Sequence, residues 1–249
     1  MPFSGNNKKT VVFDDKHILS DQSPFAVQEA YKALRTSLIF STAQEGCQVI
    51  LVTSSEQGET KSTTAVNLGL SFAQNKSRVL LIDCDLRLPT VAQKLKLPDT
   101  PGLTDMLVGR AKASEAVKKL SNGLYVLPAG TLPPNPAELL GSKTMGLLIE
   151  QMKPNFDQII LDTPPVNALS DSLVLTPLSS GVVLVTRQGM TSGKELRAAI
   201  QKLEFADAHI YGVVLTGNKT EKRSGKKGYG YRYGHGYDYS RSYERASQQ

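Results

Sequence analysis

Six short apolar runs, spread along most of the chain, constrain its fold more than any other feature. The runs cover residues 49–53, 79–83, 124–128, 159–162, 181–186 and 210–215. They are rich in Val, Ile and Leu and do not alternate between apolar and polar residues, which indicates strands covered on both faces. Helical patterns lie between them at 62–74, 103–107, 138–152 and 192–203. This order predicts an α/β fold with a doubly wound, mostly parallel sheet.

Two polar ends flank the predicted domain, which is expected to span 23–218 and to begin with a helix after Ser23-Pro24. Residues 1–22 lack periodicity, so we expect a flexible N-terminal arm or a segment ordered by docking. Residues 219–249 form a Gly/Tyr-rich tail that cannot bury a core, and we expect it to be disordered. The tail holds six of the nine tyrosines, namely Tyr229, Tyr231, Tyr233, Tyr237, Tyr239 and Tyr243.

The charge of the chain is concentrated in the same tail. The 249 residues carry a net charge of +6, of which residues 219–249 contribute +5 from eight Lys/Arg and three Asp/Glu. The basic character therefore belongs to the tail. Basic residues interleaved with aromatics could stack nucleic-acid bases, but the rest of the chain adds almost no positive charge, so we do not expect nucleic acid as a partner. The sequence has no apolar run that is long enough to span a membrane and no signal-peptide pattern, so we expect a cytoplasmic protein. Two cysteines and three scattered histidines predict neither disulfides nor a zinc site.

A lysine-containing loop follows the first predicted strand and precedes the helix at 62–74, which is the context of a phosphate-binding loop. In this loop Lys61 would reach the β- and γ-phosphates, and Ser62 would place its hydroxyl on Mg²⁺. The candidate nucleotide-binding residues are Gln57, Gly58, Glu59, Thr60, Lys61, Ser62 and Thr63. The motif departs from G-x-x-x-x-G-K-[ST], because Ser55 and Thr60 stand where glycines are expected.

Acidic residues end two of the other apolar runs. Asp83 and Asp85 lie at the end of one run and Asp162 ends another. In a doubly wound sheet the site lies beyond the carboxyl ends of the strands, so we expect the three acids to converge near Lys61. The simpler interpretation is that each acid caps the helix that follows it. A magnesium-nucleotide site explains all three acids together, since carboxylates can hold the metal and accept a proton from an attacking hydroxyl.

Together these segments resemble the bacterial tyrosine kinases of the capsule and exopolysaccharide type. The segment SSEQGETKSTTAVNLG resembles their Walker A loop, LLIDCDLR their Walker A′ pattern and IILDTPP their Walker B pattern. The segments SPFAVQEAYKALRTSLIFS and GLYVLPAGTLPPNPAELL are similar to stretches of the same family, and the tyrosine-rich tail completes the likeness. The resemblance covers about residues 23–218 and implies a P-loop NTPase fold of the MinD/ParA-like kind.

The resemblance also implies roles for individual residues. Lys61 would bind phosphates, while Ser62, Asp85 and Asp162 would hold Mg²⁺. Asp83 would be the residue that activates the tyrosine hydroxyl, and Arg87 would support the site. The implied cofactors are ATP and Mg²⁺, and the six tail tyrosines would be the phosphorylated substrates.

The implied partners include a second copy of the chain. Glu29, Lys32 and Arg35 occupy an E-x-x-R-x-x-R oligomerisation motif, with Lys32 in place of the first arginine, and the implied assembly is a ring. A separate transmembrane activator would recruit the protein to the inner face of the cell membrane, and a cognate tyrosine phosphatase would act on the tail. Lysine keeps the charge of arginine but loses its bidentate geometry, so the ring contact is expected to be weaker.

Two alternative functions remain open from the sequence. Thr60 replaces the family's glycine, and the crowding it introduces is expected to cost about 1–3 kcal/mol. The chain could therefore be a catalytically weakened scaffold of a polysaccharide-export complex. The other alternative is a MinD/ParA-like ATPase, but those proteins usually carry an extra lysine where this chain has Glu56, and they lack a tyrosine tail.

Overall fold

A computed structural model of the chain describes residues 17–42 and 46–217. The strands are β1 (Gln48–Ser54), β2 (Val79–Asp83), β3 (Lys118–Lys119), β4 (Tyr125–Leu127), β5 (Gln158–Asp162), β6 (Gly181–Arg187) and β7 (Ile210–Thr216). The α-helices are α1 (Phe25–Ser41), α2 (Lys61–Gln74), α3 (Val91–Lys94), α4 (Leu103–Leu107), α5 (Ala113–Ala116), α6 (Pro136–Leu140), α7 (Lys143–Met152) and α8 (Gly193–Phe205). Two 3₁₀ helices, η2 (Lys153–Asn155) and η3 (Leu173–Leu178), precede β5 and β6.

The strands form one seven-stranded sheet in the order β3-β4-β2-β5-β1-β6-β7. Every neighbouring pair is parallel except β3 and β4, which are antiparallel. Strand β1 lies between β5 and β6, with Leu51 opposite Leu161 on one side and Val182 on the other. The carboxyl ends of β1, β2 and β5 therefore lie next to one another, and the prediction of a mostly parallel, doubly wound sheet is confirmed.

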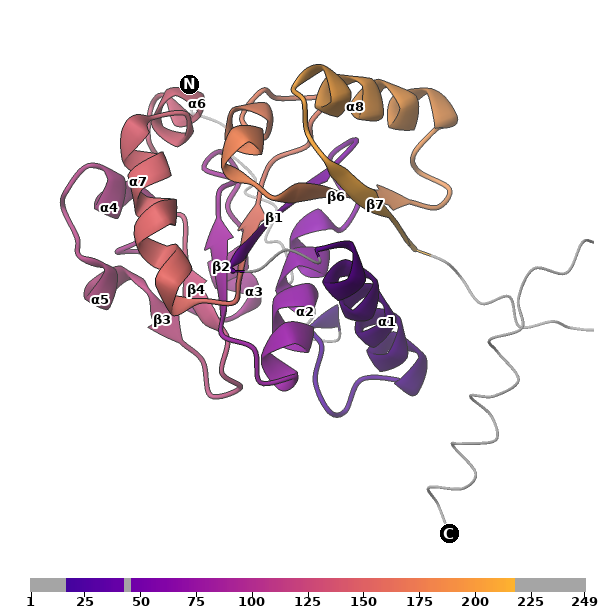
Figure 1. The fold of residues 1–249 in the computed structure, drawn as a ribbon, viewed down its shortest axis with the longest axis horizontal. Coiled ribbons are helices and arrows are strands. Elements are labelled where there is room, and N and C mark those ends of the chain that lie inside the picture. Colours follow the sequence, from indigo (N-terminus) through magenta and orange to yellow (C-terminus); the bar gives the residue numbers. More distant parts are fainter. Residues whose placement is uncertain (1–16, 43–45, 218–249) are drawn as a thin grey trace, which may run out of the picture.

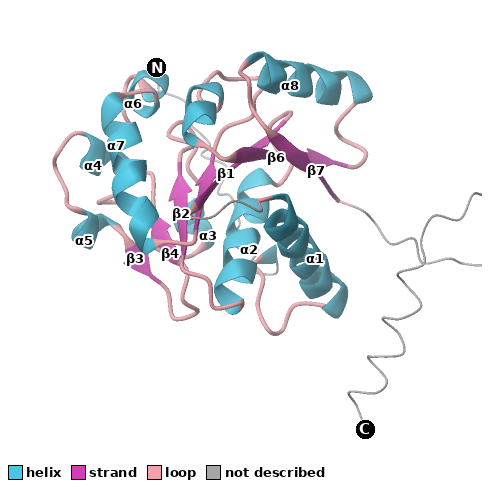
Figure 2. Ribbon diagram, in the orientation of Figure 1, coloured by secondary structure: helices cyan, strands magenta, loops and turns pink. Residues whose placement is uncertain are grey.

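Two hydrophobic cores lie on opposite faces of the sheet, because successive side chains of a strand point to opposite faces. In β1, Val49 and Leu51 belong to the core that includes Leu148 of α7 and Leu203 of α8. Ile50 and Val52 belong to the other core, beneath α2. Figure 2 shows helices on both sides of the sheet, and in Figure 1 α1 lies beside α2. Apolar side chains on both faces explain why the strand sequences do not alternate.

The structure contains the short helices α3, α5, η2 and η3, which were not predicted, and it differs from the predicted elements at two further places. The single helix expected over 138–152 is instead two helices, α6 and α7. The first helix ends at its C-cap residue Gly141, and the second begins after its N-cap residue Ser142. The Ser142 hydroxyl accepts a hydrogen bond from the Met145 N–H and so caps α7. The antiparallel strand β3 was not predicted, since two lysines carry no apolar pattern.

The last residues of the expected N-terminal arm pack on the domain. Leu19 is buried, and its N–H donates to Asn67 Oδ1 on α2. The Asn67 amide donates in turn to the His17 carbonyl. Residues 17–19 thus contact α2 through Asn67, and the two alternatives for the arm as a whole stay open. Residues 1–16 and the six tail tyrosines lie outside the described residues. In the described part of the chain, no helix is long and apolar enough to cross a membrane.

Candidate active site

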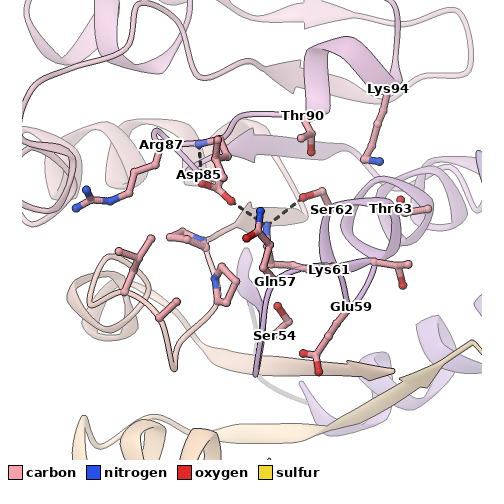
Figure 3. A pocket seen from close by; sticks show the side chains of 17 residues that line it. Ser54, Gln57, Glu59, Lys61, Ser62, Thr63, Asp85, Arg87, Thr90 and Lys94 are labelled. Atoms are coloured by element: carbon pink, nitrogen blue, oxygen red, sulfur yellow. Dashed lines mark hydrogen bonds and ion pairs between the residues drawn. The ribbon is translucent and has the colours of Figure 1, made fainter. Parts of the chain in front are cut away.

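A cavity of about 310 Å³ opens beyond the carboxyl ends of the central strands (Figure 3). All seven residues of the predicted phosphate-binding loop, 57–63, line it. Asp85, Arg87, Thr90 and Lys94 line it from the segment that follows β2. The volume lies at the lower end of the range of small-ligand pockets. The loop and the β2 segment, which are separate in sequence, therefore share one site.

The backbone of the loop is shaped to receive an anion. Gly58 has a φ of 89° and Thr60 a φ of 65°, so the backbone of both residues lies in the left-handed region. Left-handed residues within such a loop turn backbone N–H groups toward a common concavity. The helix α2 begins immediately afterwards at Lys61. Its first N–H groups lack intrahelical partners and carry the positive end of the helix dipole, which favours phosphate.

The amino group of Lys61 lies at the centre of a set of oxygen atoms. Its Nζ is 2.8 Å from Asp162 Oδ1, 3.0 Å from Ser62 Oγ and 3.5 Å from Asp85 Oδ2. The Lys61 side chain is only 8% exposed. Burial acts to lower the pKa of Lys61, but the charges of Asp162 and Asp85 outweigh it, and the pKa is raised. Lys61 is therefore held as a cation between two carboxylates.

The three residues that provide these oxygen atoms are the ones that the resemblance assigned to Mg²⁺. Ser62, Asp85 and Asp162 already converge on a cation, the ammonium of Lys61. The second oxygen of Asp162, Oδ2, is buried and has no hydrogen-bond partner, which suits an additional ligand there. Mg²⁺ prefers oxygen ligands and takes only one or two carboxylates in phosphate sites. The residues present therefore fit a magnesium ion that is shared with phosphates.

Asp83 lies opposite Asp162 in the ladder of β2 and β5, and its charge acts on Lys61, but its own oxygens are held by backbone N–H groups. One of its oxygens accepts the Asp85 N–H, and the other accepts the N–H groups of Thr90 and Val91 at the start of α3. Asp83 is fully buried and does not line the cavity. Burial and the charge of Asp162 raise its pKa to about 8, which would suit a proton acceptor. Its hydrogen bonds to Thr90 and Val91 match the simpler interpretation of a helix cap, and its role as the activator of the tyrosine hydroxyl stays a prediction.

Arg87 lines the cavity but directs its guanidinium away from Lys61 (Figure 3). Its Nε and Nη2 donate to the two carboxylate oxygens of Asp171 at 2.8 and 3.1 Å. Asp171 is fully buried, so this bidentate pair fixes the segment after β2 against the segment after β5. Arg87 thus contacts Asp171, a residue that no motif in the sequence singles out, and its supporting role in the site stays a prediction.

Glu59 also departs from a simple binding role. Its carboxylate is buried and accepts hydrogen bonds from the Glu56 N–H and the Thr191 hydroxyl. Glu59 can therefore offer its backbone to a ligand but not its charge. Lys94 on α3 is a further cavity residue that the sequence did not indicate. Burial lowers its pKa, and Figure 3 shows its amino group directed toward the side of the cavity that holds Ser62 and Thr63.

The three residues of the expected oligomerisation motif lie along α1 but face different surroundings. Glu29 and Lys32 form an exposed ion pair at 2.8 Å. Arg35 instead turns to α2, where its Nη1 donates to the carbonyl of Ser71 at 2.5 Å. Arg35 therefore contributes to packing within the chain, while Glu29 and Lys32 remain accessible.

Several known proteins are similar to this chain in sequence and in fold. A family model described as an AAA domain matches residues 47–207. The tyrosine-protein kinase YwqD of Bacillus subtilis is 39% identical over 204 residues, which are 82% of this chain and 85% of that protein. The chain belongs to the bacterial tyrosine-protein kinases. Another member, the tyrosine-protein kinase CpsD of Streptococcus agalactiae, is 34% identical to this kinase over 190 residues, which are 76% of this kinase and 82% of CpsD.

Solved structures place the kinase in the same family. The kinase domain of the Escherichia coli tyrosine kinase ETK superposes with a TM-score of 0.76 at 31% identity, covering 86% of this kinase and 87% of that chain. The MinD protein of Pyrococcus horikoshii superposes with a TM-score of 0.59 at 22% identity, covering 70% and 72% of the two chains, and shares the fold alone. One alternative considered from the sequence was a MinD/ParA-like ATPase. This kinase shares the fold of those proteins but belongs to the tyrosine-protein kinase family.

Proposed function

We propose that this kinase transfers phosphate from Mg-ATP to Tyr229, Tyr231, Tyr233, Tyr237, Tyr239 and Tyr243 in the tail of a neighbouring subunit. The observation that carries the proposal is the convergence of Lys61, Ser62, Asp85 and Asp162 beside a cavity lined by the phosphate-binding loop. A lysine charge, a hydroxyl and two carboxylates are the groups with which P-loop proteins position phosphates and a metal.

Each residue has a distinct task in this proposal. The backbone of 57–63 and the first turn of α2 bind the phosphates, and Lys61 adds a point charge. Ser62, Asp85 and Asp162 hold Mg²⁺, which neutralises charge on the phosphate oxygens. Asp85 also lines the cavity, and Asp83, next to Asp162 in the sheet, is the residue proposed to activate the tyrosine hydroxyl. The pair of Arg87 and Asp171 keeps the segments of Asp85 and Asp162 together.

The wider role in the cell follows from the family. We infer a regulator of capsular or exopolysaccharide synthesis and export, recruited to the inner face of the membrane by a separate transmembrane activator. A ring of subunits would bring each tail to its neighbour's site, and a cognate phosphatase would reverse the modification. In the putative tyrosine-protein kinase EpsB of Ralstonia solanacearum the matching segment is only 27% of the protein, so kinases of this family also occur within longer chains.

Incubation of the chain with Mg-ATP, followed by phosphotyrosine mapping by mass spectrometry, tests the proposal. We expect phosphate on tail tyrosines and a strong increase when the activator's cytoplasmic segment is added. A variant with all six tail tyrosines changed to Phe should retain ATP binding and lose the signal. A full chain that binds Mg-ATP but stays unphosphorylated with the activator would favour the alternative of a scaffold.

Removal of the exposed pair on α1 is expected to weaken the ring. Glu29→Ala with Lys32→Ala should shift the particle toward a folded monomer, measured by light scattering with activator present, because both side chains face outward. An exposed pair contributes at most about 1 kcal/mol to the stability of one subunit, so folding should hardly change. The control is Glu150→Ala with Lys153→Ala, a similar i,i+3 pair at the end of α7. A full-sized ring in the α1 variant would place the contact elsewhere.

A further inference from the structure

Thr60 adopts a backbone conformation that its residue type disfavours. Its φ of 65° is left-handed, and a β-branched residue there is a genuine outlier, because the Cβ crowds the backbone. In the family that the sequence resembles, glycine occupies this position and adopts the conformation without cost. Thr60 immediately precedes Lys61 and the first turn of α2. Something in this chain must therefore hold the loop in the left-handed form.

The hydroxyl of Thr216 is placed to do so. Thr60 Oγ1 donates to Thr216 Oγ1 at 3.0 Å. Thr216 Oγ1 in turn lies 3.2 Å from the Glu59 carbonyl and 3.2 Å from the Thr186 carbonyl, to which it can donate. One hydroxyl thus contacts the side chain of Thr60, the backbone of the residue before it and the neighbouring strand β6. A valine of the same shape could make none of these hydrogen bonds.

Thr216 is itself held firmly at the end of β7. It pairs with Arg187 in the parallel ladder with β6, and its carbonyl accepts the Gln188 N–H. Arg187 provides a second tie to the loop, since its Nη1 donates to the Gly58 carbonyl at 3.2 Å. Both left-handed residues of the loop are thus fastened to the ends of β6 and β7, two strands that carry none of the predicted site residues.

We propose that Thr216 is a positioning residue for nucleotide binding, whose hydroxyl compensates for Thr60 in a loop position otherwise suited to glycine. The inference rests on the proposed function, because it assigns the loop to phosphate. It predicts that positions 60 and 216 are coupled, so that the hydroxyl of Thr216 matters more for ATP binding when position 60 is Thr than when it is Gly.

A double-mutant cycle tests the coupling, with Mg-ATP affinity measured by calorimetry and unfolding measured in urea. Thr216→Val should weaken ATP binding roughly 5- to 30-fold, because it strands the Thr60 hydroxyl and the Glu59 carbonyl. Thr216→Ser should stay within about twofold of wild type, since it restores the hydroxyl. Thr60→Gly removes the left-handed strain and should bind ATP more tightly than wild type. In that background Thr216→Val should weaken ATP binding by a clearly smaller factor than in the wild type, because only the Glu59 carbonyl then loses its donor.

The outcomes separate the possible failures. Equal losses from Thr216→Val in both backgrounds would reduce Thr216 to a general structural residue and overturn the proposal. Unchanged affinity in the single variant would overturn it as well. If the wild-type chain bound no Mg-ATP, the proposed function would fall, and the unfolding cycle would still show whether positions 60 and 216 are coupled. Coupling in unfolding without coupling in binding would contradict the positioning role.

Discussion

Asp162→Asn is expected to lower the affinity for ATP in the presence of Mg²⁺ by about 100-fold or more. The carboxylate lies at the end of β5, is fully buried, and has one oxygen on Lys61 and one without a partner. Asn keeps the shape of the side chain but removes the negative charge that would attract Mg²⁺. Loss of one charge from a buried pair costs on the order of 3–5 kcal/mol when the partner is stranded. Lys61 retains Asp85, so we expect the loss of folding stability to lie below that range.

Calorimetric titration with and without Mg²⁺, together with urea unfolding, separates the two effects. The matched control is Asp157→Asn, which makes the same change beside the opposite end of β5. Asp157 forms an exposed pair with Arg78 at 3.0 Å, far from the loop, so ATP affinity should not change. Equal Mg-dependent affinity in the Asp162 variant and the wild type would remove Asp162 from the metal site.

Lys61→Met is expected to reduce tail phosphorylation by roughly 10²- to 10³-fold, the usual effect of removing one preorganised charge from a transition state. Lys61 is the residue that contacts Ser62, Asp85 and Asp162 together, and it opens the helix whose first turn faces the cavity. Met preserves the length of the side chain and its packing along the buried stem. The two carboxylates lose their shared cation, so we also expect a modest loss of stability.

The rate of phosphotyrosine formation at saturating ATP measures this effect, and thermal unfolding checks that the variant is folded. Lys143→Met is the control, because Lys143 is exposed at the start of α7, on the other face of the sheet from α2. A Lys61 variant that is folded and phosphorylates its tail at the wild-type rate would show that the chemistry occurs elsewhere.

Local patterns in the sequence were enough to predict the fold. The apolar runs indicated strands covered on both faces, and the lysine loop and strand-end acids located the site at the carboxyl edge of the sheet. The helix break at Gly141 was missed because the apolar pattern continues across it. The short strand β3 was missed because its lysines owe their conformation to pairing with β4.

The finer assignment of roles depended on contacts that no local pattern encodes. Asp83 and Asp85 are two residues apart and look equivalent, yet only Asp85 reaches Lys61, because Asp83 is engaged by the N–H groups of α3. Arg87 finds its partner 84 residues away at Asp171. Thr60 forms a hydrogen bond with Thr216, which lies 156 residues away in the sequence. Pairs at such separations are set by the order of strands in the sheet, which the sequence alone leaves open.

A mixing experiment tests the central claim, that the site around Lys61 phosphorylates the tail of another subunit. The chain with six tail tyrosines changed to Phe is combined with the Lys61→Met chain, Mg-ATP and the activator segment, and phosphotyrosine is mapped on each. Neither chain should be phosphorylated on its own, whereas in the mixture phosphate should appear on the tail of the Lys61→Met chain. Two results would contradict the account. One is phosphate on the Lys61→Met chain when it is incubated without the other chain, and the other is no phosphate in the mixture under conditions in which the wild type is phosphorylated.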